Sequence, residues 1–467
     1  MSEFLAQCRA LLGRTHVLTA DDDKYPFEQE WRQRLRGKAM AVLRPADTAQ
    51  VAALVGLCRQ HGIPLVPQGG NTGLVFGSIP DRSGQAVVLS LQRLNRVRNV
   101  DAANNTLIAE AGCTLLHLQQ VALEAYRLFP LSLASEGTCT IGGNLSTNAG
   151  GTAVLRYGNA RELCLGLEVV TADGKIWNGL RGLRKDNTGY DLKDLFIGAE
   201  GTLGIITAAV LKLFPLPAAK KTAYVAVASA SQALALFLAA MQTFGPALTG
   251  FELISSLCGE LVKQHFGLAR PLSVNTPYDI LIEISDHHSS QHADAAMEAF
   301  LEQALANKLL LDAAVAASVK DAAHFWQLRE NISAAQAREG KNIKHDISLP
   351  VSRIPDFISG TETQLQQAFP GCRLVCFGHM GDGNLHFNVS APKGSNAEDF
   401  LDRQAAVNLL VHDQVHRFNG SISAEHGIGV LKREEMQRYK TDIELQLMRK
   451  LKHAFDPDNL MNPGKIL

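Results

Sequence analysis

The chain has 467 residues, of which 46% are hydrophobic and 19% are charged, as in an ordinary globular protein. This length is too great for one compact core and predicts two or three domains. The 45 basic and 46 acidic side chains leave a net charge of −1, which argues against general binding to nucleic acids or to membrane surfaces.

Cysteine spacing and the N-terminal stretch bear on the compartment. Eight cysteines are scattered along the chain without a Cys-x-x-Cys pair, which argues against an iron–sulfur cluster and predicts buried free thiols in a reducing compartment. The stretch MSEFLAQCRALLGRT lacks the pattern of a secretory leader, and no segment approaches the roughly 20 apolar residues of a membrane span. We therefore expect a soluble, cytoplasmic protein.

The first half of the chain predicts alternating strands and helices. Asp47 or Thr48 can cap a helix that Gly62 ends, and Asp173-Gly174 predicts a hairpin turn. Short apolar runs predict strands at 41–45, 63–68, 86–91, 106–112 and 165–172.

After Pro217 the rhythm changes, which indicates a domain boundary. Helical patterns at 231–245 and 292–308 interleave irregularly with the strands, which predicts an α+β sheet covered on one face. A helical tail is predicted at 433–455, before the end sequence DPDNLMNPGKIL. Strands are predicted at 223–229, 250–255, 279–285, 311–318, 345–350, 373–380 and 384–390.

Two loops, at 67–78 and 135–159, are rich in glycine, asparagine and threonine, and GAEGTLGIIT at 198–207 adds a third such stretch. Glycine lets backbone approach a ligand closely, and consecutive N–H groups form an anion-binding concavity that suits a diphosphate. Neither long loop has the GxGxxG or P-loop pattern. A single loop of this kind is often only a turn, whereas three favour a binding site.

Together PQGGNTGL, EGTCTIGGNLSTNAGG, RYGN, GLEVVTADG, KDNTGYDL, GAEGTLGIIT and FDPDNLMNPGKIL resemble the FAD-linked oxidases of the vanillyl-alcohol-oxidase type, in that family's order. The resemblance implies an α+β protein with an FAD-binding domain of two α/β subdomains at 1–217. It also implies an antiparallel-sheet cap domain for substrate at 218–420. A helical C-terminal segment at 421–467 would return to the flavin.

The same resemblance implies which residues bind FAD. The first loop has no histidine that could tether the flavin, so we expect FAD to be non-covalent. The implied contacts to the diphosphate are Gln68, Gly69, Gly70, Asn71, Thr72 and Gly73. Those to the rest of the cofactor are Gly137, Thr138, Gly142, Gly143, Thr147, Asn148, Gly151, Gly201, Ile206 and Asn462.

GHMGDGNLHFN and SAEHGIG carry three candidate metal ligands. His379 ends one predicted strand, and His386 and Asn388 share one face of the next. Glu425 stands beside His426 between small residues. Each histidine alone could be a hydrogen-bonding residue near a turn, but two imidazoles and a carboxylate together suit Zn²⁺ with positions left open for substrate.

These motifs resemble those of metal-dependent D-2-hydroxyacid dehydrogenases. The resemblance implies His379, His386 and Glu425 as ligands of Zn²⁺ or another divalent metal. It implies His426 as the residue that takes the hydroxyl proton, with a role in orienting Glu425 as the alternative. Asn388 would contact substrate. The implied activity is oxidation of a D-2-hydroxy acid to the 2-oxo acid by hydride transfer to flavin.

Arg329, Ser333 and Lys344 bear on which acid is oxidised. Arg329 and Ser333 are four residues apart and would share a face of one helix, and Lys344 would begin the next strand. They match an Arg, a Thr and a Lys that contact substrate in D-2-hydroxyglutarate dehydrogenases, with Ser333 keeping the hydroxyl. This implies D-2-hydroxyglutarate as substrate, then D-malate. Alone, Arg329 could pair with a surface acid.

The sequence leaves several alternative functions and several electron acceptors open. The rivals are a D-lactate or glycolate dehydrogenase or oxidase, an FAD-binding subunit without activity, and a relative of UDP-sugar reductases. No haem or iron–sulfur motif is present in the sequence, so electrons would pass to a separate acceptor, either an electron-transfer flavoprotein, a quinone or a cytochrome. A homodimer is typical of similar proteins.

Overall fold

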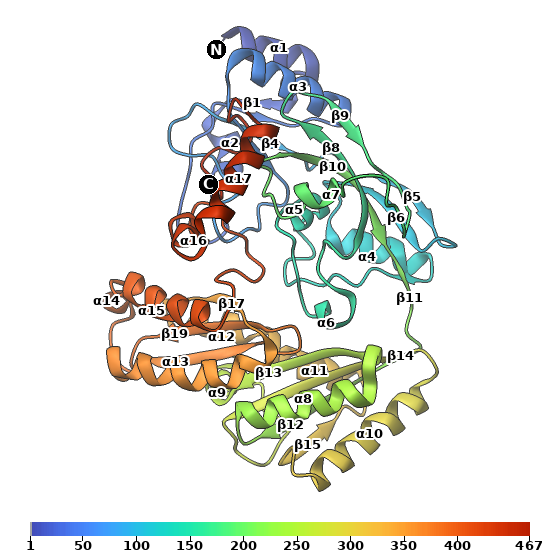
Figure 1. Ribbon diagram of the computed structural model, residues 1–467, viewed down its shortest axis with the longest axis vertical. Coiled ribbons are helices and arrows are strands. Elements are labelled where there is room, and N and C mark those ends of the chain that lie inside the picture. The colour runs from blue at the N-terminus through green and yellow to red at the C-terminus, as the bar shows by residue number, and fades with distance from the viewer. Residues whose placement is uncertain (1) are drawn as a thin grey trace. The chain divides into compact units, whose positions relative to one another are not determined.

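The computed structural model describes residues 2–467, which form two compact units. Among the described residues, the terminal unit consists of 2–151, Tyr157–Leu216 and Glu425–Leu467. The central unit consists of Thr152–Arg156 and Pro217–Ala424. Figure 1 shows the secondary structure of each unit.

A four-stranded sheet in the order β1-β2-β4-β3 begins the terminal unit, and β2, β3 and β4 run parallel. The helix predicted between its strands is confirmed: Asp47 accepts the backbone N–H of Gln50 at 2.8 Å, and Gly62 ends the helix in the left-handed region. The elements are α1 (Ser2–Leu12), η1 (Arg14–His16), β1 (Val17–Leu18), α2 (Asp21–Glu28), β2 (Val42–Leu43), α3 (Thr48–His61), β3 (Leu65–Gln68) and β4 (Val87–Ser90).

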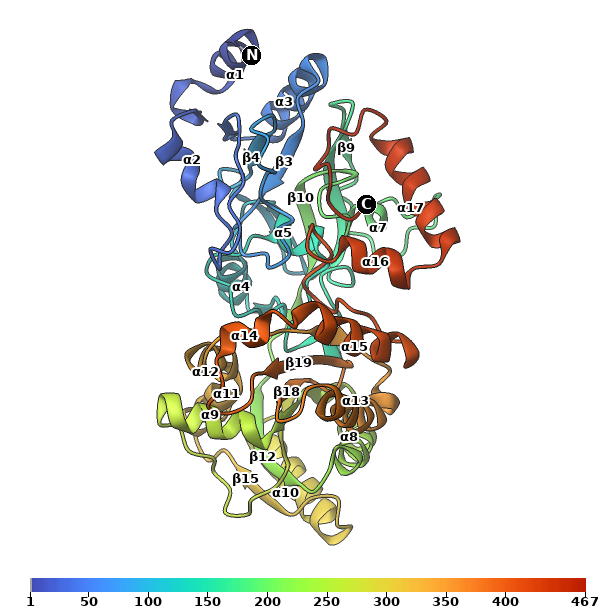
Figure 2. The same ribbon diagram turned by 90° about the vertical axis from the view of Figure 1, so that its left-hand side faces the viewer.

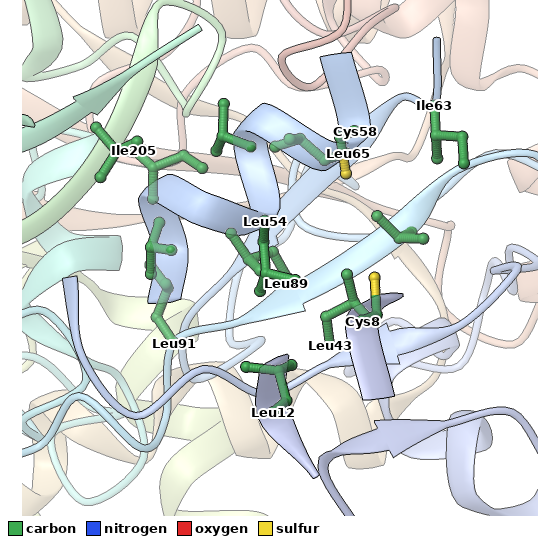
Figure 3. Close-up of a cluster of buried hydrophobic side chains, with 14 of the residues drawn as sticks. Cys8, Leu12, Leu43, Leu54, Cys58, Ile63, Leu65, Leu89, Leu91 and Ile205 are labelled. Atoms are coloured by element: carbon green, nitrogen blue, oxygen red, sulfur yellow. The ribbon is translucent and has the colours of Figure 1, made fainter. Parts of the chain in front are cut away.

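The core of this sheet is built from α1, α3 and the parallel strands. Cys8 and Leu12 of α1 meet Leu54 and Cys58 of α3 in one buried cluster with Leu89 of β4 (Figure 3). All eight cysteines of the chain are buried and free, as the scattered spacing predicted. Burial of these side chains stabilises the sheet, and the first glycine-rich loop follows the end of its strand β3.

A second, five-stranded antiparallel sheet follows in the order β5-β6-β10-β8-β9. The predicted Asp173-Gly174 turn joins β8 to β9, with Gly174 at φ 76°. The elements are β5 (Val97–Asp101), β6 (Thr106–Glu110), α4 (Leu115–Glu124), β7 (Arg127–Leu128), α5 (Ile141–Ser146), α6 (Val154–Tyr157), β8 (Cys164–Thr171), β9 (Ile176–Asn178), α7 (Lys193–Phe196), β10 (Gly204–Lys212) and β11 (Phe214–Pro215).

The C-terminal tail returns to the parallel sheet of the terminal unit. The predicted helical tail is divided into α16 (Arg433–Tyr439) and α17 (Asp442–Phe455), because Thr441 and Glu444 form a capping box that begins a new helix. After α17, Met461 pairs in parallel with Leu65, and the N–H of Asn462 donates to Leu65 O at 2.8 Å. The last residues therefore lie at the root of the first glycine-rich loop.

The central unit contains one eight-stranded sheet in which every described pair is antiparallel, in the order β15-β12-β14-β13-β18-β19-β16, with β17 also on β19. The expected antiparallel sheet is confirmed. Its strands are β12 (Ala219–Val227), β13 (Leu248–Ser255), β14 (Tyr278–Asp286), β15 (Asp312–Val315), β16 (Asn342–Ile343), β17 (Asp346–Ser348), β18 (Arg373–His379) and β19 (Asn384–Ser390).

Helices cover both faces of this sheet, so the prediction of one covered face is wrong. Phe251 contacts Phe237 of α8 on one face, and Tyr224 contacts Phe325 of α11 on the other. Figure 2 shows α8 and α13 on one side of the strands and α9, α11 and α12 on the other. Seven of the eight residues of β13 are buried, which is the pattern of a strand with no solvent face.

The helices of the central unit are α8 (Ala230–Phe244), η2 (Gly245–Ala247), α9 (Ser256–Phe266), α10 (Ser290–Ala306), α11 (Val319–Glu330), α12 (Ile332–Glu339), η3 (Val351–Arg353), α13 (Ile354–Ala368), α14 (Ala397–Leu401) and α15 (Gln404–Arg417). Within residues 2–467, none of the helices combines the length and apolar character needed to cross a membrane.

Candidate active site

The two glycine-rich loops of the terminal unit pack directly against each other. A Cβ atom on Gly70 would lie 2.0 Å from the carbonyl oxygen of Thr138, and one on Gly69 would lie 2.3 Å from Thr140 Oγ1. Only glycine permits this approach of the two backbones. Gly201 is similarly placed, since its Cβ would lie 2.4 Å from Pro67 Cγ.

Gln68 and Asn71 shape the first loop from within. Gln68 Nε2 donates to the carbonyl oxygens of Phe27 and Ser78, at 2.9 and 2.7 Å. Asn71 has a φ of 54°, and its Nδ2 donates to Gln29 O at 2.9 Å while its Oδ1 accepts from Ser78 Oγ at 2.9 Å. Both side-chain amides therefore form hydrogen bonds to other groups of the protein.

The other predicted cofactor residues are distributed around these loops. Gly142 and Gly143 lie in α5, whose C-terminal cap Thr147 donates through Oγ1 to Gly143 O at 3.2 Å. Asn148 Oδ1 accepts the N–H of Arg161 at 3.0 Å, and Ile206 is buried in β10. Thr72 is half-buried, Gly73, Gly137 and Thr138 are exposed, and Gly151 has a φ of 132°.

Four buried polar atoms gather around the loops. Within residues 2–467, Ser90 Oγ, Thr140 Oγ1, Asn144 Oδ1 and Asn462 Oδ1 have no hydrogen-bond partner. Buried polar atoms are normally paired, so a polar ligand at the loops would satisfy them. The hydroxyl groups and the close-packed glycine backbone fit the diphosphate and sugar of FAD.

Glu200 connects three of the segments that the sequence singled out, and the sequence analysis missed it. Its carboxylate accepts the backbone N–H groups of Ile428 and Gly429 at 2.7 and 2.8 Å, in the loop after His426. Its carbonyl oxygen accepts Asn462 Nδ2 at 2.8 Å. Burial raises the pKa of Glu200, although the two N–H donors oppose that effect.

In the central unit, strand register aligns four polar residues on one face of the sheet. Glu252 of β13 pairs with His379 of β18, and His386 of β19 pairs with Phe377 of β18 and with Asp346 of β17. Cross-strand partners and residues two apart share a face. His379 and His386 therefore lie diagonally, with ring centroids 6.3 Å apart.

Glu252 is a buried carboxylate that holds two of the predicted site residues. His379 Nδ1 lies 2.5 Å from Glu252 Oε1, and Arg329 Nε donates to Glu252 Oε2 at 2.7 Å. Arg329 also lies over the ring of Phe377, with Cζ 4.7 Å from the ring centroid. Burial by itself would raise the pKa of Glu252, but His379 and Arg329 outweigh burial and lower it to about 2.

The candidate metal ligands gather at this end of the sheet. Ala424 donates its N–H to Asp346 O at 3.3 Å, so chain connectivity holds Glu425 and His426 nearby. One potential ligand atom each of His379, His386 and Glu425 lies within 4.8 Å of the other two, and the same holds for Asp346, Glu425 and His426. Two imidazoles and a carboxylate are a ligand set that fits Zn²⁺.

The predicted substrate residues are less closely grouped than the sequence suggested. Arg329 lies in the last turn of α11 and Ser333 in the first turn of α12. The helix breaks at Asn331, so the prediction of one shared helix is wrong. Ser333 is exposed, whereas Arg329 is buried. Lys344 is exposed in the link between β16 and β17 and does not begin a strand.

Asn388 is buried and already engaged by protein groups. Its Nδ2 donates to Gln336 Oε1 at 2.8 Å, and its Oδ1 accepts the N–H of His345 at 3.1 Å. An amide has two N–H donors and two acceptor lone pairs, so one of each remains for a further contact. In this structure Asn388 ties β19 to α12.

Glu252 and Asp346 were missed by the sequence analysis, although each left a trace. Glu252 is a charged residue in the middle of the apolar strand GFELIS, and a buried charge inside a strand needs a partner. Asp346 lies in the predicted strand HDISLP, where its amide partner Asn384 donates to Oδ1 at 3.0 Å. The partners could not be named without strand register.

Comparison with protein families assigns both halves of the chain. A profile of an FAD binding domain matches residues 39–179. A profile of the C-terminal domain of FAD linked oxidases matches residues 216–466, which is more than half of the chain.

Curated relatives match over nearly the whole chain. The protein named D-2-hydroxyglutarate dehydrogenase, mitochondrial, from Danio rerio is 39% identical over 466 residues, covering 100% of this chain and 85% of that protein. A D-2-hydroxyglutarate dehydrogenase from Xanthomonas citri pv. viticola is 37% identical, covering 96% and 93%. A putative D-lactate dehydrogenase, mitochondrial, from Schizosaccharomyces pombe is 34% identical, covering 94% and 84%.

Solved structures show the same fold at low identity. The structure of p-cresol methylhydroxylase has a TM-score of 0.79 at 16% identity, covering 100% of this chain and 96% of that chain. A 4-ethylphenol oxidase from Gulosibacter chungangensis has a TM-score of 0.75 at 17% identity, with the same coverages. At these identities the likeness shows the fold alone.

The expectation of a cytoplasmic protein is contradicted by these comparisons. The relatives from Danio rerio, Bos taurus, Oryza sativa and Arabidopsis thaliana are named as mitochondrial proteins. Buried free thiols exclude only oxidising compartments and do not distinguish one reducing compartment from another.

The fold and the two family matches agree with each other. The glycine-rich loops lie within or beside the matched FAD-binding segment, and the antiparallel sheet lies within the matched C-terminal domain. Relatives at 34–39% identity cover the chain almost completely. The chain therefore belongs to the FAD-linked oxidases and is an FAD-dependent oxidoreductase with the vanillyl-alcohol-oxidase-type fold.

Proposed function

We propose that this chain is a metal-dependent dehydrogenase that oxidises a D-2-hydroxy acid, D-2-hydroxyglutarate before D-malate, to the 2-oxo acid. The observation that carries the proposal is that one potential ligand atom each of His379, His386 and Glu425 lies within 4.8 Å of the other two. The names of relatives that share the whole chain support the substrate class.

His379, His386 and Glu425 are proposed to hold Zn²⁺ or another divalent ion. A bound divalent ion supplies a Lewis acid for the hydroxyl and carboxylate oxygens of the substrate. The Glu252 carboxylate accepts from His379 Nδ1, which leaves Nε2 as the ligand nitrogen. Asp346, the cross-strand partner of His386, is proposed to support that ring in the same way.

The terminal unit is proposed to bind FAD through its glycine-rich loops, without a covalent link. The proposed contacts are the loop residues predicted above, among which Gln68 and Asn71 act by holding the loop's shape. Asn462 would approach the flavin ring, since its buried Oδ1 has no partner within residues 2–467. Bound FAD supplies the acceptor for the hydride that leaves C2 of the substrate.

His426 is proposed as the residue that takes the hydroxyl proton on a neutral imidazole nitrogen. Removal of that proton from oxygen and of a hydride from C2 together convert the hydroxy acid into the oxo acid. Glu200 holds the backbone that follows His426, and Arg329 offers its guanidinium to the distal carboxylate of the substrate. Ser333, Lys344 and Asn388 are proposed as further substrate contacts.

A D-lactate dehydrogenase is the second candidate. The 34% identical relative named putative D-lactate dehydrogenase favours it, and so does the exposure of Ser333 and Lys344. The two candidates differ in the distal carboxylate, which only the dicarboxylic acids have. Leaving the donors of Arg329 without that carboxylate costs on the order of 1–3 kcal/mol, roughly a tenfold to hundredfold preference.

The test is a panel of D- and L-2-hydroxy acids with an artificial electron acceptor and zinc-loaded protein. We expect D-2-hydroxyglutarate to have the highest kcat/KM, D-malate the next and D-lactate at least tenfold less, with the L-acids inactive. Anaerobic bleaching of the flavin by the same acids gives an acceptor-independent check. A higher kcat/KM for D-lactate than for D-2-hydroxyglutarate would select the monocarboxylate candidate.

We propose a separate electron acceptor and a homodimer for the working protein. The eight cysteines are dispersed and individually buried, so they do not form the ligand set of an iron–sulfur relay. An electron-transfer flavoprotein, a quinone and a cytochrome are the acceptor classes to compare in the same assay. Sedimentation of the purified protein measures its oligomeric state.

A further inference from the structure

One buried carboxylate, Glu252, joins the two halves of the proposed site in the central unit. Its Oε1 lies 2.5 Å from Nδ1 of the metal-ligand candidate His379, and its Oε2 accepts Nε of Arg329 at 2.7 Å. Glu252 has no exposed surface. Glu252 and His379 are cross-strand partners on one face of the sheet, and Arg329 reaches them from α11. The side chain therefore meets these donors away from water.

The geometry requires a carboxylate with two accepting oxygens. Arg329 Nε can only donate, and His379 must donate from Nδ1 if Nε2 is to be a metal ligand. A glutamine at this position could accept one of these bonds but would present an N–H group to the other donor. The two carboxylate oxygens of Glu252 thus satisfy both donors.

We propose that Glu252 is a positioning residue that sets metal affinity through His379 and dicarboxylate affinity through Arg329. By fixing Nε of Arg329, it turns the Nη edge of the guanidinium toward a carboxylate ligand. By fixing Nδ1 of His379, it selects the tautomer and ring orientation for the metal. This inference rests on the proposed function, because it takes His379 as a ligand and Arg329 as the carboxylate contact.

The main variant is Glu252→Gln, which keeps the side-chain volume. The matched control is Glu283→Gln on the neighbouring strand β14, where the carboxylate accepts Trp326 Nε1 at 2.9 Å and pairs with Lys220. Glu283 contacts neither His379 nor Arg329 in any described interaction. Both variants are prepared as FAD-loaded full chains.

The first measurement is zinc affinity by competition with a chelator, which needs no turnover. Loss of the carboxylate that supports a metal-ligand histidine typically weakens metal binding by about 10- to 100-fold. We expect that loss in Glu252→Gln and no change in Glu283→Gln. Wild-type affinity in both variants would overturn the proposal.

The second measurement tests the effect of Glu252 on Arg329. It compares the calorimetric binding of 2-oxoglutarate with that of pyruvate at saturating zinc. Glu252→Gln should weaken 2-oxoglutarate binding more than pyruvate binding, because only 2-oxoglutarate has a distal carboxylate. In an Arg329→Met background the same substitution should no longer affect 2-oxoglutarate, while the loss of zinc affinity should persist. Additive effects on 2-oxoglutarate in the double variant would overturn the coupling through Arg329.

The outcomes distinguish this inference from the proposed function. If the wild-type protein binds neither zinc nor 2-oxoglutarate, the proposed function fails first. If it binds both and Glu252→Gln matches it, only the positioning role fails. Should Glu252→Gln not fold, Glu252→Asp replaces it, since its shorter side chain cannot reach both donors and at least one affinity must fall.

Discussion

The orientation of the Arg329 guanidinium depends on two contacts within the protein. Its Nε is taken by Glu252, and its planar group lies over Phe377. Both contacts orient the fork so that its Nη edge can face a carboxylate in two-point fashion. A lysine ammonium carries the same charge, but it is not planar and does not form two parallel hydrogen bonds to a carboxylate.

Arg329→Lys should therefore lower kcat/KM for D-2-hydroxyglutarate by about 10- to 100-fold, which corresponds to losing roughly 1–3 kcal/mol of binding to the distal carboxylate. D-Lactate turnover should change little. The measurement is kcat/KM for both acids in the acceptor assay. The control is Arg338→Lys on α12, where Arg338 stacks on Phe266. An equal loss for both acids would contradict the assignment of Arg329 to the distal carboxylate.

At the scale of single elements, the turn between β18 and β19 determines whether His379 lies beside His386. Gly383 has a φ of 90°, and a Cβ there would lie 2.2 Å from the carbonyl oxygen of Leu349. Gly360 inside α13 has no such neighbour within 4 Å. The same substitution should thus have opposite effects at the two positions.

We expect Gly383→Ala to destabilise the protein by roughly 1–3 kcal/mol and to weaken zinc binding, because the strained turn must shift. Gly360→Ala should stabilise it by about 0.5–1 kcal/mol through helix propensity and leave zinc binding intact. Thermal unfolding and zinc titration measure both variants. Unchanged zinc affinity in Gly383→Ala would show that the turn does not set the ligand geometry.

The start of α17 makes a second prediction at this scale. A hydrogen bond from Lys440, followed by those from the Thr441 backbone and hydroxyl, lowers the pKa of the exposed Glu444 to about 2. Because the folded pKa is below the usual 4.5, the stabilisation is present above pH 4.5 and is lost as the pH falls toward 2. Thr441→Ala should cost the helix about 1 kcal/mol.

Hydrogen exchange in α17 measures this pH dependence. Glu444→Gln should exchange faster than the parent protein at pH 6, and the difference should shrink as the pH falls from 4.5 toward 2. The exposed Glu298 of α10 supplies the control variant Glu298→Gln, which should leave α17 unchanged. A difference that stays constant down to pH 2.5 would rule out the capping role of the ionised carboxylate.

At the scale of the whole molecule, the proposed FAD contacts and the metal-ligand histidines belong to different compact units. His379→Ala should lose zinc and turnover but keep FAD. Gly70→Ala should lose FAD, because its Cβ would lie 2.0 Å from Thr138 O, while the central unit still binds zinc. Elemental analysis measures the zinc content of the two purified variants, and flavin absorbance measures their bound FAD.

Acid precipitation of the wild-type protein completes the test. FAD should appear in the supernatant, because the first loop has no histidine that could tether it. FAD that remains with the precipitated chain would contradict the non-covalent assignment. Joint loss of FAD and zinc in both variants would show that the two sites do not form independently.

Local features of the fold could be predicted from the sequence because they depend on residues close together in the chain. The cap at Asp47, the end at Gly62 and the turn at Asp173-Gly174 each rest on contacts within a few residues. The capping box of Thr441 and Glu444, which divides the C-terminal tail into two helices, also rests on contacts within a few residues. Family resemblance supplied the FAD cofactor, which the match to an FAD binding domain supports.

Only the tertiary structure decided how the candidate site is supported. Glu252 and His379 are 127 residues apart, and they meet because β13 pairs with β18 in one register. Strand register depends on the whole sheet, and a shift by one residue would turn Glu252 to the opposite face. The sequence by itself determined which residue types are available as ligands, whereas the long-range pairing of strands decided which carboxylate holds each histidine.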